Sequence, residues 1–301
     1  MPRTGRLHMP GGYYHVIGRG IERRAIFSND VDKEDFLSRL DRNLARSQTK
    51  CLAWALMPNH YHLLIRVGDS PLAKLMAGLL GGYASSYNRR NDRVGYVFQN
   101  RFKSILCDAD NYLHQLVRYI HLNPLRAGLI ENLRALDHYR WTGHAGVLGK
   151  NPRCWHETES VLRIFGTTKK SARKNYLDFL TISSESSDEV HCNGGGLVRS
   201  YGGWENVCRL RQEHVRCIGD EQILGASHFV DEILAQDELS LENRTHLELQ
   251  GWTLEKLMLR VCNQYDVTPE SLSRQTRNNS HSTAKSLICF WGMSSLGLGA
   301  R

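Results

Sequence analysis

The sequence predicts an α+β fold, with an antiparallel sheet and helices in the N-terminal half and a mostly helical C-terminal region. Up to about residue 123, short runs rich in β-branched and aromatic residues alternate with stretches whose apolar residues recur at helical spacing. Residues 157–181 and 227–300 show helical spacing instead. The chain of 301 residues is long enough for two domains with ordinary cores.

Four strands are expected. The first covers residues 12–18, and residues 51–56 and 60–65 form a hairpin because a Pro-Asn turn signal separates them. The side chains of Leu52, Trp54 and Leu56 are expected on one side of that hairpin. Residues 95–106 are predicted as the fourth strand, with interleaved aromatic and cationic residues. That pattern suits a groove for single-stranded nucleic acid, and an ordinary amphipathic strand explains it equally well.

Two helices flank the hairpin in the sequence. The first follows a cap at Asn29 or Asp30 and places apolar residues at helical spacing, namely Phe36, Leu37, Leu40 and Leu44. The second begins at Ser70, whose hydroxyl can cap it, with Pro71 at the first helical position. Its apolar stripe is most simply core, and the glycine pair at 81–82 is expected to kink or loosen it.

A third helix carries two polar residues of interest, Tyr119 and Asn123. It is expected to open at Asp108 or Asp110 and to end at about residue 123, because Pro124 follows. Tyr119 and Asn123 are four residues apart and share a helix face if the helix reaches that far.

Two histidines stand two residues apart in the second strand of the hairpin. Side chains at i and i+2 of a strand point to the same face, so His60 and His62 present two imidazoles side by side, while Tyr61 faces the other way. Imidazole is a common ligand of divalent metals. On the two histidines alone, polar residues on the wet face of a hairpin strand are an equal explanation.

Charge is spread unevenly along the chain. Residues 1–150 hold 22 Lys and Arg against 12 Asp and Glu, a net of +10, and residues 151–301 hold 17 against 19, a net of −2. The basic half is dominated by arginine, whose planar fork suits phosphate, so it favours a nucleic-acid partner. No apolar run is long enough to cross a membrane, and eight scattered cysteines without a C-x-x-C pair argue against a disulfide scaffold.

These residues together suggest one reaction. A metal held by His60, His62 and the amide oxygen of Asn123 would polarise a phosphate oxygen, and the phenolate of Tyr119 would attack phosphorus. The product would be DNA linked to tyrosine, with a free 3′-hydroxyl. Rival tyrosines remain at positions 61, 83, 87 and 112. Position 61 should face away from the metal, and positions 83 and 87 fit a core stripe.

Two segments resemble a known family. Residues 57–64, Met-Pro-Asn-His-Tyr-His-Leu-Leu, resemble the HUH motif of single-tyrosine transposases. Residues 118–129, Arg-Tyr-Ile-His-Leu-Asn-Pro-Leu-Arg-Ala-Gly-Leu, resemble the tyrosine helix of the REP-associated, insertion-sequence-200-like branch. The likeness covers about residues 8–130. It implies a ferredoxin-like core, catalytic Tyr119, the metal ligands His60, His62 and Asn123, Mg²⁺ or Mn²⁺, and single-stranded DNA hairpins as substrate.

The predicted organisation has three parts. Residues 1–148 form the catalytic domain, residues 149–226 a linker and helical region, and residues 227–301 a helical DNA-binding domain. Flexible loop is expected at residues 183–189 and 194–196. Residues 254–297 have a helix-turn-helix cadence and resemble the DNA-binding domain of the bacterial replication initiator. The resemblance predicts a further helix-turn-helix after this point, so that domain is expected to be shortened.

The leading functional prediction is a DNA transposase that cleaves and rejoins single strands. The alternatives are a domesticated, non-catalytic protein that binds DNA hairpins and a replication initiator or relaxase with the same chemistry. A cytoplasmic, nucleoid-associated location in a bacterium is expected, and a homodimer, with the tyrosine acting in cis or in trans, stays open. DNA contacts are expected from basic residues of the N-terminal half, namely Arg19, Arg23, Arg24, Arg89, Arg90, Arg101, Lys103 and Arg118.

Overall fold

The structure is a computed structural model that describes residues 7–68, 70–182, 196, 200–201, 204–213, 215, 217–273 and 279–296. The chain divides into two compact units, residues 1–230 and residues 231–301. Each unit is described by itself. The expected loops at residues 183–189 and 194–195 lie outside the described residues.

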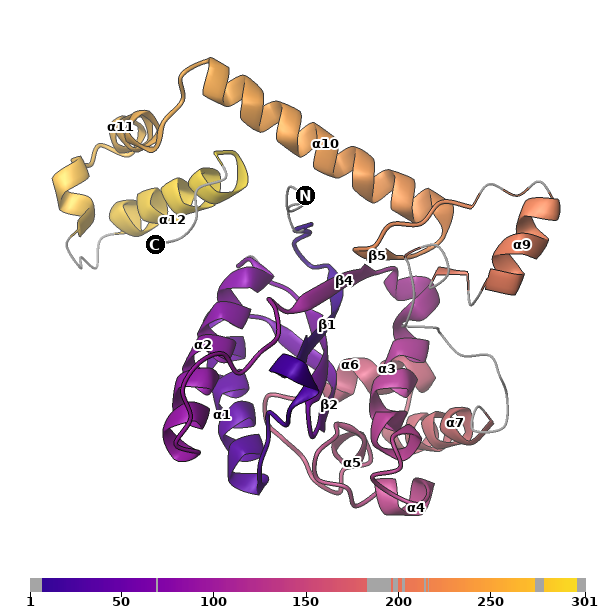
Figure 1. Cartoon of the computed structure of the whole chain (residues 1–301). Helices are drawn as coiled ribbons and strands as arrows, with labels where there is room; N and C mark the ends of the chain where they lie inside the picture. Colours follow the sequence, from indigo (N-terminus) through magenta and orange to yellow (C-terminus); the bar gives the residue numbers. More distant parts are fainter. Residues whose placement is uncertain are drawn as a thin grey trace. The chain divides into compact units, whose positions relative to one another are not determined.

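The first unit is built on a five-stranded sheet with the order β2-β3-β1-β4-β5 (Figure 1). Its strands are β1 (Tyr13–Arg19), β2 (Lys50–Met57), β3 (His60–Arg66), β4 (Lys103–Cys107) and β5 (Ile223–Leu224). The first four run antiparallel to their neighbours, and β5 adds a parallel edge to β4. The predicted hairpin is confirmed, because Met57 pairs with His60 across the turn.

Two helices cover one face of this sheet, α1 (Asp30–Ser47) and α2 (Leu72–Arg90) (Figure 1). The chain runs β1-α1-β2-β3-α2-β4, which is the ferredoxin-like connection, so the predicted α+β core is confirmed. Aromatic rings fill the space between the layers. The ring of Phe36 lies 5.0 Å from that of Tyr61 and 5.3 Å from that of Tyr83.

The opposite face is covered by α3 (Ala109–Arg126), with α6 (Thr158–Phe165) and α7 (Lys169–Ile182) packed in the same core. Buried residues of β2, β4 and α3 form this core together with Val161 of α6 and Tyr176 of α7. Arg153 joins the connecting segment to α1 through two hydrogen bonds of 2.8 Å to Glu34. Residues 149–182 are therefore part of the same compact unit as the sheet.

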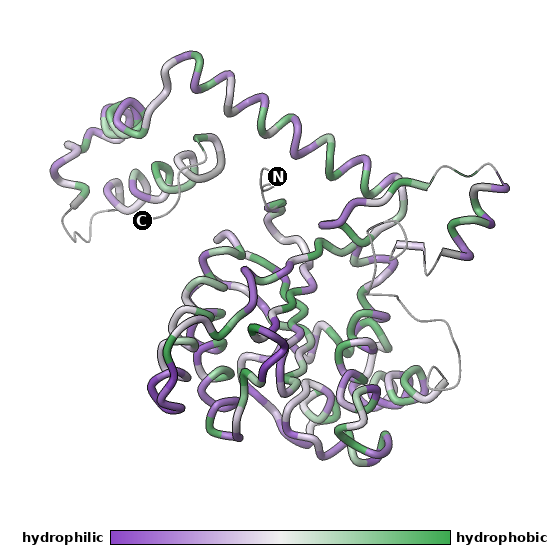
Figure 2. Tube along the Cα trace, in the orientation of Figure 1, coloured by the Kyte–Doolittle hydropathy of each residue, from purple (hydrophilic) through white to green (hydrophobic). Residues whose placement is uncertain are grey.

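The remaining elements are short in the first unit and longer in the second. The first unit also contains η1 (Ile21–Arg23), α4 (Leu133–Leu136), α5 (His144–Val147) and α9 (Trp204–Gln212). From residue 227 the chain forms α10 (Ser227–Leu249), α11 (Leu254–Gln264), η2 (Pro269–Ser273) and α12 (Asn279–Ser294). Hydrophilic and hydrophobic residues alternate along α10 (Figure 2). Among the described residues, no helix combines the length and hydropathy needed to cross a bilayer.

The first two predicted helices form with small differences. Asn29 caps α1, and its side chain accepts a hydrogen bond from the amide of Asp32, as predicted. The prediction for α2 was wrong by one position, because Pro71 is the cap residue and no side chain caps the helix. The glycine pair at 81–82 does not interrupt α2, since packing of Leu79 and Tyr83 in the core outweighs the low helix propensity of glycine.

The predicted fourth strand is too long. Only Lys103–Cys107 form β4, while residues 94–102 are irregular and join the sheet through a single bridge from Phe98 to Gly20. In β2 the pairing register shifts between Cys51 and Ala53. This bulge places Leu52 in the core on the α3 side, so the prediction that Leu52 shares a side with Trp54 was wrong.

The helix α3 continues past the proline that was expected to end it. Pro124 lacks an N–H group, so the bond to the carbonyl of Ile120 is lost, yet the buried ring is accommodated and the helix extends to Arg126. The amide of Ala127 then bonds the carbonyl of Asn123 at 2.9 Å. Asn123 is therefore inside the helix, and its side-chain direction is fixed.

Tyr61 packs so closely on Gly18 that a side chain at position 18 is expected to destabilise the fold. A Cβ atom at Gly18 would lie 2.4 Å from the Tyr61 hydroxyl oxygen, whereas one at Gly81 meets nothing within 4 Å. We expect Gly18→Ala to lower the free energy of unfolding by about 1–3 kcal/mol through overpacking. Gly81→Ala, the matched control in a helix, should raise it by about 0.5–1 kcal/mol. Urea denaturation followed by circular dichroism measures both, and equal effects would contradict the predicted packing.

Candidate functional site

The strand β3 presents both histidines on the sheet face that α3 covers. Partners across an antiparallel pair share a face, so the register places Arg19 beside His60 and Ile17 beside His62. Lys103 of β4 is the partner of Ile17 on the other side of β1. Two cations of neighbouring strands therefore flank the histidine pair.

The predicted nucleophile lies against this pair. The rings of His60 and His62 have centroids 5.0 Å apart, and the ring of Tyr119 lies 5.6 Å from that of His62 in an edge-on contact. All three residues belong to the same chain. The packing of α3 on the sheet therefore brings together three of the side chains that the sequence singled out.

Both histidines are held neutral. Burial, and to a lesser extent the charge of Arg19, lowers the pKa of His60 to about 4. Burial lowers the pKa of His62 well below its ordinary value, with smaller contributions from His15, His60 and Arg19. A neutral imidazole keeps a lone pair available to a metal ion.

The donor atoms fit a divalent cation. The Nδ1 of His60 is engaged with the side-chain oxygen of Asn59 at 2.7 Å, and the Nδ1 of His62 is engaged with the Nε2 of His15 at 3.0 Å. Each Nε2 is then the nitrogen left for a metal. The Nδ2 of Asn123 donates to the carbonyl of Tyr119 at 2.8 Å, which leaves its amide oxygen as the third donor. Imidazole and amide oxygen are both accepted ligands of Mn²⁺ and Mg²⁺.

A metal ion could also be bound by another group of side chains, such as a cluster of His, Cys, Asp or Glu residues. Within the described part of the chain, no three His, Cys, Asp or Glu side chains come together in a way that could hold an ion. Asn123, whose amide oxygen is not used by its bond to Tyr119, stays the predicted third ligand beside the two histidines.

The rival tyrosines are engaged elsewhere. Tyr61 is fully buried against Phe36 on the opposite face of the sheet. The hydroxyl of Tyr83 donates to the carbonyl of Ile26, and that of Tyr87 lies 2.9 Å from the hydroxyl of Ser28. The hydroxyl of Tyr112 donates to the carbonyl of Ser200 at 2.6 Å. Tyr119 is the one tyrosine of this group beside the histidines.

The predicted DNA contacts fall into two groups. Seven of them are exposed, namely Arg19, Arg23, Arg24, Arg89, Arg90, Arg101 and Lys103, and two of the eight are engaged in contacts between elements. Arg90 bonds Asp32 and Asp35 at 2.9 Å, and Arg118 is buried with its guanidinium 4.6 Å from the ring centroid of Phe179. Those two arginines therefore contribute to contacts between elements.

Two further residues, Arg126 and His15, lie at the site and were not predicted from the sequence. Arg126 lies two helical turns beyond Tyr119, and its guanidinium carbon is 5.6 Å from the centroid of the Tyr119 ring. The sequence prediction ended this helix at about residue 123, so it did not place Arg126 on the same helix as Tyr119. His15 is buried beside His62, a placement that follows from the pairing of β1 with β3. A polar residue within the apolar first strand was the available signal.

A buried polar network holds α3 from the side away from the sheet's histidine pair. The hydroxyl of Tyr176 lies 2.8 Å from the Nδ1 of His121 and 2.8 Å from the Nδ1 of His144. The Nε2 of His144 lies 2.9 Å from Asp137, which also accepts from Lys150 at 2.8 Å. The network connects the helix that carries Tyr119 to α7.

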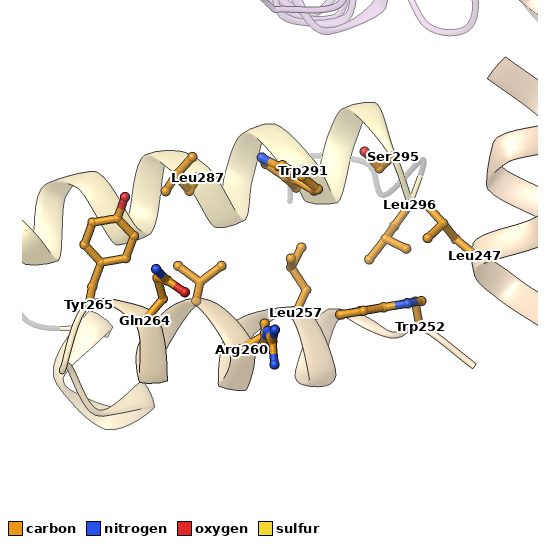
Figure 3. Close-up of a pocket in the computed structure, with 11 residues that line it drawn as sticks. Leu247, Trp252, Leu257, Arg260, Gln264, Tyr265, Leu287, Trp291, Ser295 and Leu296 are labelled. Atoms are coloured by element: carbon orange, nitrogen blue, oxygen red, sulfur yellow. The ribbon is translucent and has the colours of Figure 1, made fainter. Parts of the chain in front are cut away.

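The second unit has a groove of a different kind. It lies between α11 and α12, has a volume of about 480 Å³, and is walled by apolar and aromatic side chains such as Trp252, Leu257 and Trp291 (Figure 3). Arg260 is the one charged residue in its lining. The groove therefore lacks the acid, base and metal-binding groups that the sheet provides, and the candidate active site belongs to the first unit.

On this ferredoxin-like sheet, the histidine pair of β3 therefore faces the tyrosine of α3, and the cations Arg19 and Lys103 flank the pair. Residues 9–123 match the family model of the IS200-like transposases. The matched range includes both histidines, Tyr119 and Asn123. No curated protein is significantly similar to the chain in sequence.

Two solved structures are similar at low identity. The structure of a REP-associated tyrosine transposase bound to a REP hairpin aligns at 15% identity with a TM-score of 0.41, covering 52% of this chain and 90% of that one. The crystal structure of a putative transposase from Deinococcus radiodurans R1 aligns at 14% identity with a TM-score of 0.29, covering 44% of this chain and 97% of that one.

His156, a buried histidine outside the site, is expected to make the free energy of unfolding depend on pH. His156 donates from Nε2 to the carbonyl of Leu52 at 2.9 Å, and burial lowers its pKa to about 4. Because the folded pKa lies below the unfolded value near 6.5, the unfolded chain binds more protons between these values. This contribution to stability is complete above pH 6.5 and is lost as the pH falls toward 4, by up to about 3 kcal/mol.

We therefore expect the wild-type free energy of unfolding to fall between pH 7.5 and pH 4.5 more steeply than that of His156→Gln, which retains a donor for Leu52. Urea denaturation at both values measures the difference between the two proteins. Parallel pH dependences would show that His156 is not held neutral by burial.

Proposed function

We propose that the first unit is a metal-dependent DNA strand transferase that cleaves and rejoins single-stranded hairpin DNA through Tyr119. The observation that carries the proposal is the contact between Tyr119 and the neutral histidine pair of the same chain. The match of residues 9–123 to the family model of the IS200-like transposases supports it.

The metal is proposed to bind His60, His62 and the amide oxygen of Asn123. The family resemblance favours Mg²⁺ or Mn²⁺. When bound, such an ion would supply Lewis-acid polarisation of a non-bridging phosphate oxygen and stabilise a nearby phenolate. The protein's own contribution is to keep both imidazoles unprotonated and to hold the three donors on rigid elements, β3 and α3.

The chemical step is an exchange of one phosphodiester for another. The hydroxyl oxygen of Tyr119 forms a bond to phosphorus, its proton passes to solvent, and the bond from phosphorus to the 3′ oxygen breaks. The leaving oxygen takes up a proton and becomes a free 3′-hydroxyl, while the 5′ phosphate stays on Tyr119. Attack by a 3′-hydroxyl on this link reverses the sequence and rejoins DNA. Arg126, stacked on the Tyr119 ring, is placed to attract the phosphate.

DNA is proposed to approach along the exposed cations of the sheet face. Arg19 and Lys103 flank the histidines and are assigned to phosphates near the scissile bond. Arg23, Arg24, Arg89 and Arg101 are assigned to more distant phosphates. Arg90 and Arg118 are left out, since the first is bound to two carboxylates and the second is buried.

The second unit is proposed to add a DNA contact of its own. The succession of α11, η2 and α12 preserves the helix-turn-helix cadence that the sequence indicates, and residues 254–297 resemble the helical DNA-binding domain of the replication initiator. Residues 227–301 would then serve as the DNA-binding domain and residues 1–148 as the catalytic domain.

The proposal predicts a covalent protein–DNA adduct. End-labelled hairpin DNA incubated with the protein and Mn²⁺ should give a band that survives denaturing electrophoresis. Tyr119→Phe, which lacks the attacking oxygen, should abolish the band and still retard DNA on native gels. His60→Ala with His62→Ala should reduce adduct formation by at least about a hundredfold, because removal of the metal ligands removes its Lewis acid.

The control is Tyr112→Phe, a tyrosine on the same helix that is bonded to Ser200 and should retain the adduct. Native-gel retardation without any covalent band, across several hairpins and with both metals, would overturn the enzyme. The chain would then be a DNA-hairpin-binding protein on a transposase fold.

The assignment of Lys103, but not Arg90, to DNA phosphates predicts different effects of their substitution on the salt dependence of DNA binding. Lys103→Ala should weaken binding of single-stranded DNA and lower the slope of log affinity against log salt by about 0.7, the value for one phosphate contact. Arg90→Ala should leave the slope unchanged and instead destabilise the fold, because it leaves the buried carboxylate of Asp32 without its ion pair. Fluorescence anisotropy at several salt concentrations measures both, and an equal slope change in the two variants would contradict the assignment.

A further inference from the structure

A third histidine lies directly behind the pair. His15, on β1, is 1% exposed, and its Nε2 is 3.0 Å from the Nδ1 of His62. The two rings lie edge to edge and close to one plane, with centroids 5.2 Å apart and planes inclined by 21°. The ring of Tyr119 meets His15 edge-on at 5.8 Å. His15 therefore touches both a metal-ligand candidate and the candidate nucleophile, and the proposed chemistry gives it no role.

We propose that His15 is a positioning residue that fixes the tautomer and ring orientation of His62, so that the Nε2 of His62 is the metal donor. The proposal rests on the function proposed above. It assigns to His15 the role that carboxylates and carbonyls play behind many metal-bound imidazoles.

The position of the N–H proton between His15 and His62 decides which nitrogen of His62 can bind a metal. A bond between two neutral imidazoles needs one N–H donor and one lone-pair acceptor. If His62 donates from Nδ1, its Nε2 holds a lone pair and can bind a cation. If His62 accepts at Nδ1, its Nε2 carries the proton and cannot. Only the arrangement in which His15 accepts at Nε2 is compatible with metal binding at His62.

The contact also means that the Nε2 of His15 does not share an ion with the Nε2 of His62. The Nε2 of His15 is occupied by the nitrogen of His62 that lies on the far side of the ring from the proposed metal. The described residues show no cluster of three histidines able to share an ion. His15 therefore acts through His62, and the third ligand stays with Asn123.

The position of His15 in the sheet makes it a rigid support. β1 lies between β3 and β4, and its neighbours Tyr14 and Val16 are buried. The imidazole cannot move away without disturbing a central strand. Its edge contact with Tyr119 also means that loss of the ring would loosen the packing around the nucleophile.

The test is a Mn²⁺ titration of the full chain, with and without a hairpin oligonucleotide, in which free Mn²⁺ is measured by electron paramagnetic resonance. His15→Leu removes the acceptor, and His15→Asn keeps a polar group that is too short to reach Nδ1. We expect both to weaken Mn²⁺ binding about 10- to 100-fold. His15→Gln, whose amide oxygen can accept from His62, should restore affinity to within about threefold of wild type.

The matched control is His156→Leu, which removes another buried histidine with one hydrogen bond outside the site. It should bind Mn²⁺ as the wild type does, and circular dichroism identifies any variant that is unfolded. Wild-type affinity in folded His15→Leu or His15→Asn would overturn the inference, as would a His15→Gln variant that binds as weakly as His15→Leu. A wild-type chain that forms adduct without binding Mn²⁺ would overturn the metal site itself, a result distinct from failure of His15 alone.

Discussion

The side-chain alternation of β3 is the constraint on which the site depends. Tyr61, buried against Phe36 on the α1 side of the sheet, fixes which residues of β3 face α3. Because the alternation has a period of two, a slip of one residue would turn both histidines away from Tyr119. The apolar core under α1 thus determines the orientation of polar groups on the opposite face. Packing energy, rather than any interaction between the histidines, orients the candidate metal ligands.

The placement of Tyr119 depends on residues far along the chain. On the sheet side its ring meets His62, and two residues further along the same turn of α3 His121 is bonded to Tyr176 of α7. The family match ends at residue 123, so α7 lies outside it. A buried hydroxyl that loses either imidazole would leave an unpaired polar group at a cost of about 1–3 kcal/mol. Residues 149–182 therefore support the site rather than merely connect two domains.

Local patterns in the sequence were sufficient for the hairpin, the shared face of the two histidines and the helical register of Tyr119 and Asn123. These depend on periods of two and 3.6 residues, which a single stretch displays. The errors arose where distant residues decide. The pairing of Arg90 with Asp32, the burial of Arg118 and the bulge at Leu52 all require knowledge of which elements touch. The predicted end of α3 at about residue 123 was wrong, because a buried proline ring can be tolerated inside a helix when tertiary packing compensates for one lost hydrogen bond.

The charges of the site indicate why the metal and the DNA should depend on one another. The proposed donor set of His60, His62 and Asn123 contains no carboxylate, so these side chains would not neutralise a bound divalent ion. Arg19 adds positive charge beside His60, and this charge contributes to lowering the histidine pKa values. The same repulsion acts on a metal cation in proportion to its charge. A DNA phosphate supplies the missing negative charge to the ion and to the surrounding arginines together. Under the proposed function, the charges of the site would thus be balanced only when the DNA phosphate is bound.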